Sequence, residues 1–234
     1  MVIEEKDSLW PQRGDHLFIE REDWYYNAVL NGQRDNLSLY AVGYKRAGEI
    51  LVKSVVESRQ DHDSLVFLIA FVYRQYLELR LKQLIRDSRR LLGDNSGFPA
   101  THKIAELWKL CRPLLDQTGL KTDAQVLEVI EELIAEFAEV DEDSYAFRYP
   151  TDKRNNPSLP DLRFVNLPNL ADVIRKMSNF FEAVGWQLSV TLERETVPRL
   201  STCNASDLDG HSARQQPREF EPQEEKDAGP LISE

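Results

Sequence analysis

One stretch of the chain places opposite charges at helical spacing. Arg74, Glu78 and Lys82 follow one another at intervals of four residues, so on an α-helix they form a row of alternating charge along one face. Such a row is most often a set of exposed ion pairs, each worth roughly 0.2–0.5 kcal/mol. Because this row follows an apolar stretch, burial is the alternative interpretation, and buried charges require partners. The sequence leaves both interpretations open.

A second group of reactive side chains follows a run of acidic residues. Asp143 and Ser144 are followed by Arg148, which stands between Phe147 and Tyr149. A guanidinium beside aromatic faces suits stacking on a nucleic-acid base and pairing with a phosphate or carboxylate. Alternatively, Arg148 is structural and joins its segment to Asp143 or Glu78.

The histidines and cysteines do not form a recognisable metal site. His102 opens a predicted helix, and the other three histidines lack partners at metal-ligand spacing. Cys111 and Cys203 lie far apart, which supports neither a disulfide framework nor a Cys-based metal site. Phosphate-binding loops, dinucleotide fingerprints and nucleophile elbows are also missing. We therefore expect no metal, no cofactor and no assigned catalytic residue. The candidates for ligand binding are Arg74, Glu78, Lys82, His102, Asp143, Ser144, Arg148 and Tyr149.

The composition limits the kinds of partner that this chain can bind. Its 234 residues include 41% hydrophobic and 29% charged residues, and the net charge is -11. This charge argues against a broad basic surface that follows a nucleic-acid backbone, although a small basic pocket is compatible with it. No apolar run approaches the ~20 residues of a membrane span, and residues 1–6 do not resemble a secretory signal. We expect a cytoplasmic protein.

Periodic apolar residues predict an all-α bundle of about four or five helices. The first helix is expected at 37–58, with an apolar face formed by Leu39, Val42, Ala47, Ile50, Leu51 and Val55. The second is expected at 65–92. Pro113 is expected to break the third. The predicted N-caps of the later helices are Asp63-Ser64, Thr101, a capping box at 122–125, and Asn169, which opens a last helix ending near residue 195.

The remaining segments complete the predicted domain organisation. Residues 1–36 are expected to form an irregular arm whose aromatic side chains pack on the bundle at 37–196, and residues 197–234 a disordered acidic tail. A long connection rich in Pro and Asn covers 144–168, with a short extended piece at 162–167. The acidic face of the helix after residue 123 is most simply a solvated surface.

Taken together, three blocks of sequence resemble the HEPN domain, a helical-bundle family named for nucleotide binding. They are Tyr73–Lys82, Thr101–Trp108, and Asp143-Ser144 with Phe147–Pro150, which are similar in order and spacing to blocks of uncharacterised bacterial HEPN-like proteins. The resemblance implies a bundle that commonly forms a homodimer. It also implies a role in RNA cleavage, in RNA or nucleotide binding, or in bacterial defence or stress systems.

The HEPN-like ribonucleases carry an Arg followed, after four to six residues, by a His. No His stands at that distance after Arg148 or Arg154. The leading hypothesis is therefore a non-catalytic module that binds RNA or a nucleotide at a confined polar groove. One alternative is a metal-independent ribonuclease that uses His102 and Arg148. The other is a protein-interaction module that uses its acidic surfaces.

Overall fold

The computed structural model describes residues 9–30 and 36–196, and within these ranges the regular secondary structure is helical. Besides the helices, the described residues contain only an isolated antiparallel bridge between Thr151 and Pro157. The predicted all-α bundle is thus confirmed. The elements are η1 (Trp24–Tyr26), α1 (Asn36–Ser58), α2 (His62–Leu91), α3 (Ile104–Gln117), α4 (Ala124–Val140) and α5 (Leu167–Thr196).

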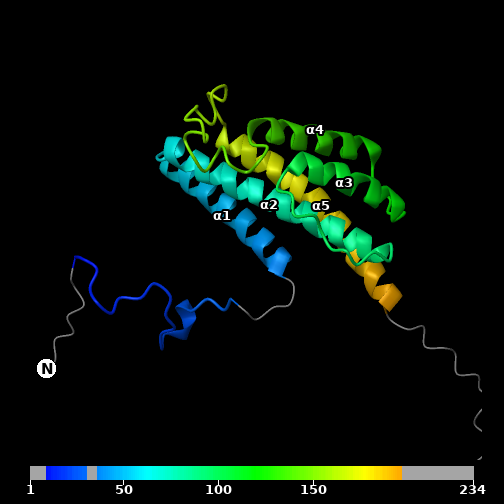
Figure 1. Ribbon diagram of the computed structural model, residues 1–234, viewed down its shortest axis with the longest axis horizontal. Helices are drawn as coiled ribbons and strands as arrows, with labels where there is room; N and C mark the ends of the chain where they lie inside the picture. The colour runs from blue at the N-terminus through cyan, green and yellow to red at the C-terminus, as the bar shows by residue number, and fades with distance from the viewer. Residues whose placement is uncertain (1–8, 31–35, 197–234) are drawn as a thin grey trace, which may run out of the picture. The chain divides into compact units, whose positions relative to one another are not determined.

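The long helix α2 is the centre of the bundle. It runs antiparallel to α1 on one side, while α3 and α4 lie on the other side and α5 crosses behind (Figure 1). Tyr73, Leu77 and Leu81 of α2 are almost fully buried, and they join one core with apolar residues of every other α-helix. Fully burying a large apolar side chain stabilises a fold by ~1.5–3 kcal/mol, so these contacts fix how α2 is oriented.

The predicted start of α2 is wrong, and so is that of α3. Helix α2 begins at His62 after Asp61, so Asp63 lies in its first turn rather than at its cap. Helix α3 begins at Ile104, and Thr101 instead accepts a hydrogen bond from the Lys103 amide. In both places a local hydrogen-bonding side chain matched the pattern of a cap, but the helical backbone hydrogen bonds begin at another residue: the Asp61 carbonyl accepts from the Leu65 amide at 2.8 Å, and the Lys103 carbonyl accepts from the Leu107 amide at 3.0 Å.

The caps of the last two helices are also shifted by one to three residues. Asp123, rather than Thr122, accepts from the Gln125 amide at 2.9 Å. Asn166 accepts from the Asn169 amide at 3.0 Å, so Asn169 lies inside α5. Residues 162–166 contain no strand and α5 already begins at Leu167, so the extended piece predicted at 162–167 does not form a strand. The next residue, Pro168, is tolerated in a first helical turn, where its missing N–H has no helical partner.

The sequence predicts that Pro113 breaks α3, and this prediction is wrong: Pro113 lies inside the helix. Cys111 and Leu115, on either side of the proline, are fully buried. A proline in a helix interior, which removes one backbone hydrogen bond, costs ~3 kcal/mol. Because the apolar stripe of α3 continues past Pro113 into the core, its burial outweighs that loss.

The buried face of α1 agrees with the predicted one only in part: Val55 and Leu51 lie against the core. Leu39, Val42 and Ile50 are about half exposed, whereas Ala41, Val52 and Val55 are buried. Gly48, on the buried side of α1, packs on the Tyr73 ring of α2: a Cβ at Gly48 would lie 2.5 Å from Tyr73 Cε1. The two helices therefore approach closely at this glycine.

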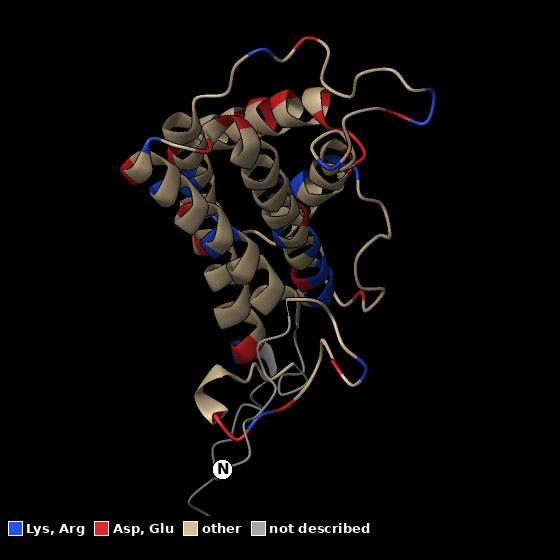
Figure 2. Cartoon of the chain, turned by 90° about the vertical axis from the view of Figure 1, so that its left-hand side faces the viewer, with Lys and Arg blue, Asp and Glu red and all other residues tan. Residues whose placement is uncertain are grey.

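The acidic face of α4 lies in solvent, as the sequence indicated. Acidic residues recur along the bundle helices, interspersed with uncharged ones (Figure 2). On α4, Leu127, Ile130 and Ile134 are buried in the core. The five glutamates of this helix are all exposed: Glu128, Glu131, Glu132, Glu136 and Glu139. The charges of α4 therefore stay hydrated while its apolar stripe holds the helix on the bundle.

The arm at residues 9–30 is irregular apart from η1, as predicted. Its aromatic side chains are largely exposed, and their packing on the bundle stays a prediction. The predicted tail, 197–234, lies outside the described residues. Within the described ranges no helix is both long and apolar enough to span a bilayer, in agreement with the sequence.

Candidate functional site

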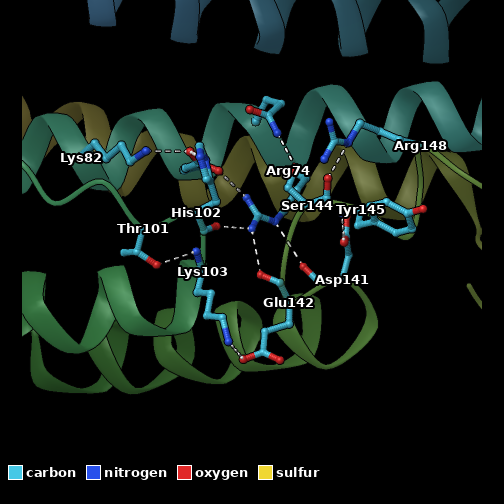
Figure 3. Close-up of polar contacts among 12 residues, drawn as sticks. Arg74, Lys82, Thr101, His102, Lys103, Asp141, Glu142, Ser144, Tyr145 and Arg148 are labelled. Carbon is cyan, nitrogen blue, oxygen red and sulfur yellow. Dashed lines mark hydrogen bonds and ion pairs between the residues drawn. The ribbon is translucent and has the colours of Figure 1, made fainter. Parts of the chain in front are cut away.

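Arg74 is the most enclosed charged residue of the site. Its side chain is fully buried in α2, and its guanidinium makes four hydrogen bonds (Figure 3). Nη1 donates to Glu78 at 3.0 Å, Nε donates to the Asp141 carbonyl at 3.4 Å, and Nη2 donates to the carbonyls of His102 and Glu142. Because these donors bind groups inside the protein, Arg74 connects α2 to the residues just before α3 and just after α4. This set of hydrogen bonds is called here the Arg74 clamp.

Glu78 is a buried carboxylate with three polar partners. Besides Arg74, its Oε1 accepts from Lys82 Nζ at 2.8 Å and lies 2.8 Å from His102 Nδ1. Burial by itself raises the pKa of this carboxyl. Hydrogen bonds from Lys82 and His102, together with the charges of Lys82 and Arg74, outweigh burial and hold the pKa below its ordinary value. Glu78 is therefore ionised at neutral pH.

His102 carries the exposed end of this network. Because an ionised carboxylate can only accept, Nδ1 carries the proton in its contact with Glu78. The side chain is 68% exposed, and Nε2 has no partner among the described residues. Such an imidazole has a fixed orientation, and Nε2 is available to a ligand in solvent.

Lys82 lies on the inner side of the network. Its side chain is 7% exposed. Nζ forms an ion pair with Glu78 Oε1 at 2.8 Å and lies 5.7 Å from the centre of the Phe98 ring. Lys82 therefore balances the buried carboxylate. Of the two interpretations that the sequence left open for the Arg74, Glu78 and Lys82 row, the structure shows the buried network.

Ser144 positions the loop that follows α4. It is buried, has a φ of 58°, and its Oγ accepts a hydrogen bond from Gln75 Nε2. Asp141, also buried, accepts from the amides of Tyr145 and Ala146 through Oδ1. These contacts hold a tight turn against α2. Ser144 is therefore a buried structural residue and is not exposed to a ligand.

Arg148 and Tyr149 are the exposed members of that loop. Arg148 Nε donates to the Ser144 carbonyl at 2.6 Å, while neither Nη1 nor Nη2 has a partner among the described residues. The guanidinium carbon lies 5.8 Å from the Phe71 ring centre and 5.6 Å from that of Tyr149. Tyr149, which is 49% exposed, also stacks on Tyr145 with ring centres 4.7 Å apart. Arg148 is thus held at one nitrogen with its two terminal amino groups toward solvent.

The predicted residues therefore divide into an inner and an outer set. The inner set supports the site from within the protein: Arg74, Glu78, Lys82 and Ser144. The outer set is exposed: His102, Asp143, Arg148 and Tyr149. Asp143 lies 3.7 Å from Lys103 and makes part of an exposed ion-pair cluster.

His102 and Arg148 lie on opposite sides of Arg74 along α2 (Figure 3). His102 contacts Glu78 and Arg148 lies over Phe71. Seven helical residues separate these two contacts, which is about 10 Å along the axis. Two exposed nitrogen groups on one face, separated by such a distance, can contact two parts of one ligand.

Four residues of the site were not singled out from the sequence: Gln75, Lys103, Asp141 and Glu142. Lys103 Nζ donates to Glu142 at 2.8 Å, and Glu142 and Asp141 also supply carbonyls to Arg74. Backbone carbonyls carry no residue-specific signal, so only the fold reveals them. The four basic residues Arg74, Lys82, Lys103 and Arg148 are matched by the acidic residues 78, 141, 142 and 143, and the site is close to neutral.

No family model, curated protein or solved structure matches this chain. The HEPN relationship therefore stays a prediction, based on the three blocks of sequence quoted above. Arg74, Glu78, Lys82 and His102 come from the first two blocks, and Ser144 and Arg148 from the third. In the fold, His102, Ser144 and Arg148 contact the same part of α2 that carries Arg74, Glu78 and Lys82.

Proposed function

We propose that this chain binds RNA or a nucleotide through its exposed surface at His102, Arg148 and Tyr149, called here the His102–Arg148 face. The observation that carries the proposal is the pair of oriented, outward nitrogen groups, His102 Nε2 and the terminal amino groups of Arg148. Each is fixed by a buried partner on its inner side, Glu78 or the Ser144 carbonyl. Donors fixed before binding lose less conformational entropy when a ligand arrives.

The chemistry of this face suits a base and a phosphate together. The exposed ring of Tyr149 offers a stacking surface, and the Arg148 guanidinium beside it can pair with a phosphate or stack in turn. The near neutrality of the surrounding charges argues against a long duplex, which is bound mainly through its phosphates. A nucleotide or a short single-stranded RNA fits this confined face better.

The binding proposal is tested with a labelled short single-stranded RNA, and with a nucleotide, over a series of salt concentrations. Arg148→Ala should weaken RNA binding roughly five- to a hundredfold and lower the salt slope by about 0.7, the loss of one phosphate contact. Arg46→Ala is the matched control, because Arg46 is an exposed arginine of α1, 69% accessible, that lies outside this face. Equal affinities of wild type and Arg148→Ala at every salt concentration would reject the proposed site.

One observation favours a second function, metal-independent RNA cleavage. The contact of His102 Nδ1 with the ionised Glu78 is the arrangement that prepares Nε2 to accept a proton. Nε2 would take the proton of an RNA 2′-hydroxyl, whose oxygen attacks the adjacent phosphorus; the P–O5′ bond breaks, the 5′-oxygen takes a proton from water, and His102 returns its own proton to the solvent. The separation of His102 and Arg148 favours binding of two ligand parts over joint action on one phosphate, so binding remains the first proposal.

The two functions are distinguished by incubating the pure protein with structured RNA and excess chelator. Cleavage to 2′,3′-cyclic phosphate ends by wild type, and its loss in His102→Ala, would support the enzyme. Cleavage that persists in His102→Ala would remove His102 from the mechanism. RNA binding by the wild type with no cleavage would leave the binding function.

A further inference from the structure

The arm before α1 contains an organised turn with three exposed aromatic side chains. Trp24–Tyr26 form one turn of 3-10 helix, and Asn27 closes the loop around it. The Asn27 side chain donates to the Arg21 carbonyl at 2.6 Å and accepts from the Arg21 amide at 3.2 Å. Residues 21–27 are called here the aromatic knuckle.

The exposure of this knuckle is unusual for a structured segment. Trp24, Tyr25 and Tyr26 are 64%, 94% and 85% exposed, although local hydrogen bonds hold their backbone in one conformation. Contiguous exposed aromatics mark interaction sites, and a prearranged turn reduces the entropy lost when they dock. The knuckle therefore has the properties of a docking element.

A groove of complementary character lies between α1 and the beginning of α5. Its volume is about 410 Å³, and its walls are apolar: Val52, Val56, Pro168, Ala171 and Ile174. Basic side chains lie at its rim, namely Lys45, Lys53 and Arg175, together with the acids Glu49 and Asp172.

The floor of the groove contains an unsatisfied polar group. Tyr73 lines it, is only 1% exposed, and its hydroxyl has no hydrogen-bond partner within the described ranges. A buried hydroxyl without a partner costs ~1–3 kcal/mol. An occupant with an apolar body and a hydrogen-bonding group would satisfy it, and tryptophan and tyrosine side chains have both features.

We propose that the aromatic knuckle docks in the α1–α5 groove of its own chain, with Trp24 against the apolar walls. Glu22 and Asp23, next to Trp24, would then face Lys53 at the rim. Lys53 makes a loose ion pair with Glu57 at 3.7 Å, whereas Lys45 and Arg175 already pair closely with Glu182 and Asp172. The interaction fixes the arm on the bundle and does not depend on RNA binding.

The length of the connecting chain allows this docking within one molecule. The start of α1 at Asn36 comes nine residues after Asn27, and an extended chain of nine residues spans up to about 30 Å. From Asn36 to Val52 the helix rises about 24 Å, at about 1.5 Å per residue. The knuckle can therefore reach the groove without any change in the bundle.

The test uses the full chain with Trp10→Phe and Trp186→Phe, which leaves Trp24 and the buried Trp108 of the four tryptophans. Quenching of their fluorescence by acrylamide then reports the accessibility of Trp24. We expect weak quenching in this parent protein. Val56→Glu, which places a charge in the groove wall, should raise the quenching constant several-fold.

Two further variants make this result specific to the groove. Val129→Glu on α4 is the matched control, because Val129 and Val56 are 51% and 52% exposed, and it should leave quenching unchanged. Ala171→Glu, on the opposite wall, should act like Val56→Glu. Quenching of the Trp24 signal in the parent as strong as that of an isolated peptide of residues 9–30 carrying Trp10→Phe would overturn the proposal. Protection that disappears on dilution, together with a dimer in sedimentation, would overturn it in favour of a second copy.

Discussion

The guanidinium of Arg74 lies 3.0 Å from the carboxylate of Glu78, and the two side chains are 0% and 3% exposed. Both charges are thus removed from water and depend on each other and on the carbonyls around them. A buried pair of this kind contributes little net stability compared with apolar residues, but losing one partner strands the other. Through the carbonyls of His102, Asp141 and Glu142, Arg74 also joins α2 to the segments just before α3 and just after α4.

Arg74→Ala should destabilise the fold by about 3–5 kcal/mol, since it leaves Glu78 short of a counter-charge and three carbonyls without a donor. Arg74→Lys should recover only part of this loss, because one ammonium group cannot reproduce the planar fork of donors. Urea unfolding followed by circular dichroism measures the difference. Arg46→Ala, at an exposed position, should change stability by less than about 0.5 kcal/mol. A loss that small for Arg74→Ala would show that the clamp is not needed.

Glu78→Gln should make the stability of the protein less dependent on acid pH. Because the folded-state pKa of Glu78 lies below its unfolded value, the carboxylate contributes stability that is fully present above about pH 4.5 and is lost as the pH falls through the folded-state pKa. The variant should be less stable by about 3 kcal/mol at about pH 7, with a smaller difference at about pH 3. Glu57→Gln, in an exposed pair, is the control. A constant difference at both pH values would contradict the prediction.

Two glycines of α1 should respond in opposite directions to alanine. Gly48→Ala places a Cβ 2.5 Å from the Tyr73 ring, so it should destabilise the protein by about 1–3 kcal/mol through overpacking. A Cβ at Gly43 would meet no described atom within 4 Å, and Gly43→Ala should stabilise the protein by about 0.5–1 kcal/mol because alanine favours the helix. The melting temperatures of the two variants, measured by thermal unfolding, test this prediction. Similar changes in melting temperature for both variants would refute the close contact of α1 and α2.

Cys111 should be unreactive until the protein unfolds. Its side chain is fully buried in α3, and burial raises the pKa of the thiol to about 12, so little thiolate exists at neutral pH. In a Cys203→Ser variant, a thiol reagent at about pH 8 should label no cysteine in the native protein and one in urea. Rapid labelling of the native variant would instead reveal frequent local opening of α3.

Much of the fold could be predicted from the sequence because the relevant information is local. Apolar residues at helical spacing identified all five helices, and the Arg74, Glu78 and Lys82 spacing placed three charges on one face of α2. The positions of the helix ends were harder to predict from the sequence. At Thr101 and Asn169, suitable capping side chains stand near the true start of the helix, but packing decides which residue begins it.

What only the tertiary structure decided is burial and the contacts between distant segments. The same charge row is compatible with an exposed or a buried helix face, and it is the carbonyls of His102, Asp141 and Glu142 that allow Arg74 to be buried. The sequence alone thus determined which residues carry charge and which helix holds them. The fold decided that Arg74 and Glu78 face inward while His102 and Arg148 face solvent, because desolvating a charge is tolerated only where the surrounding chain supplies its partners.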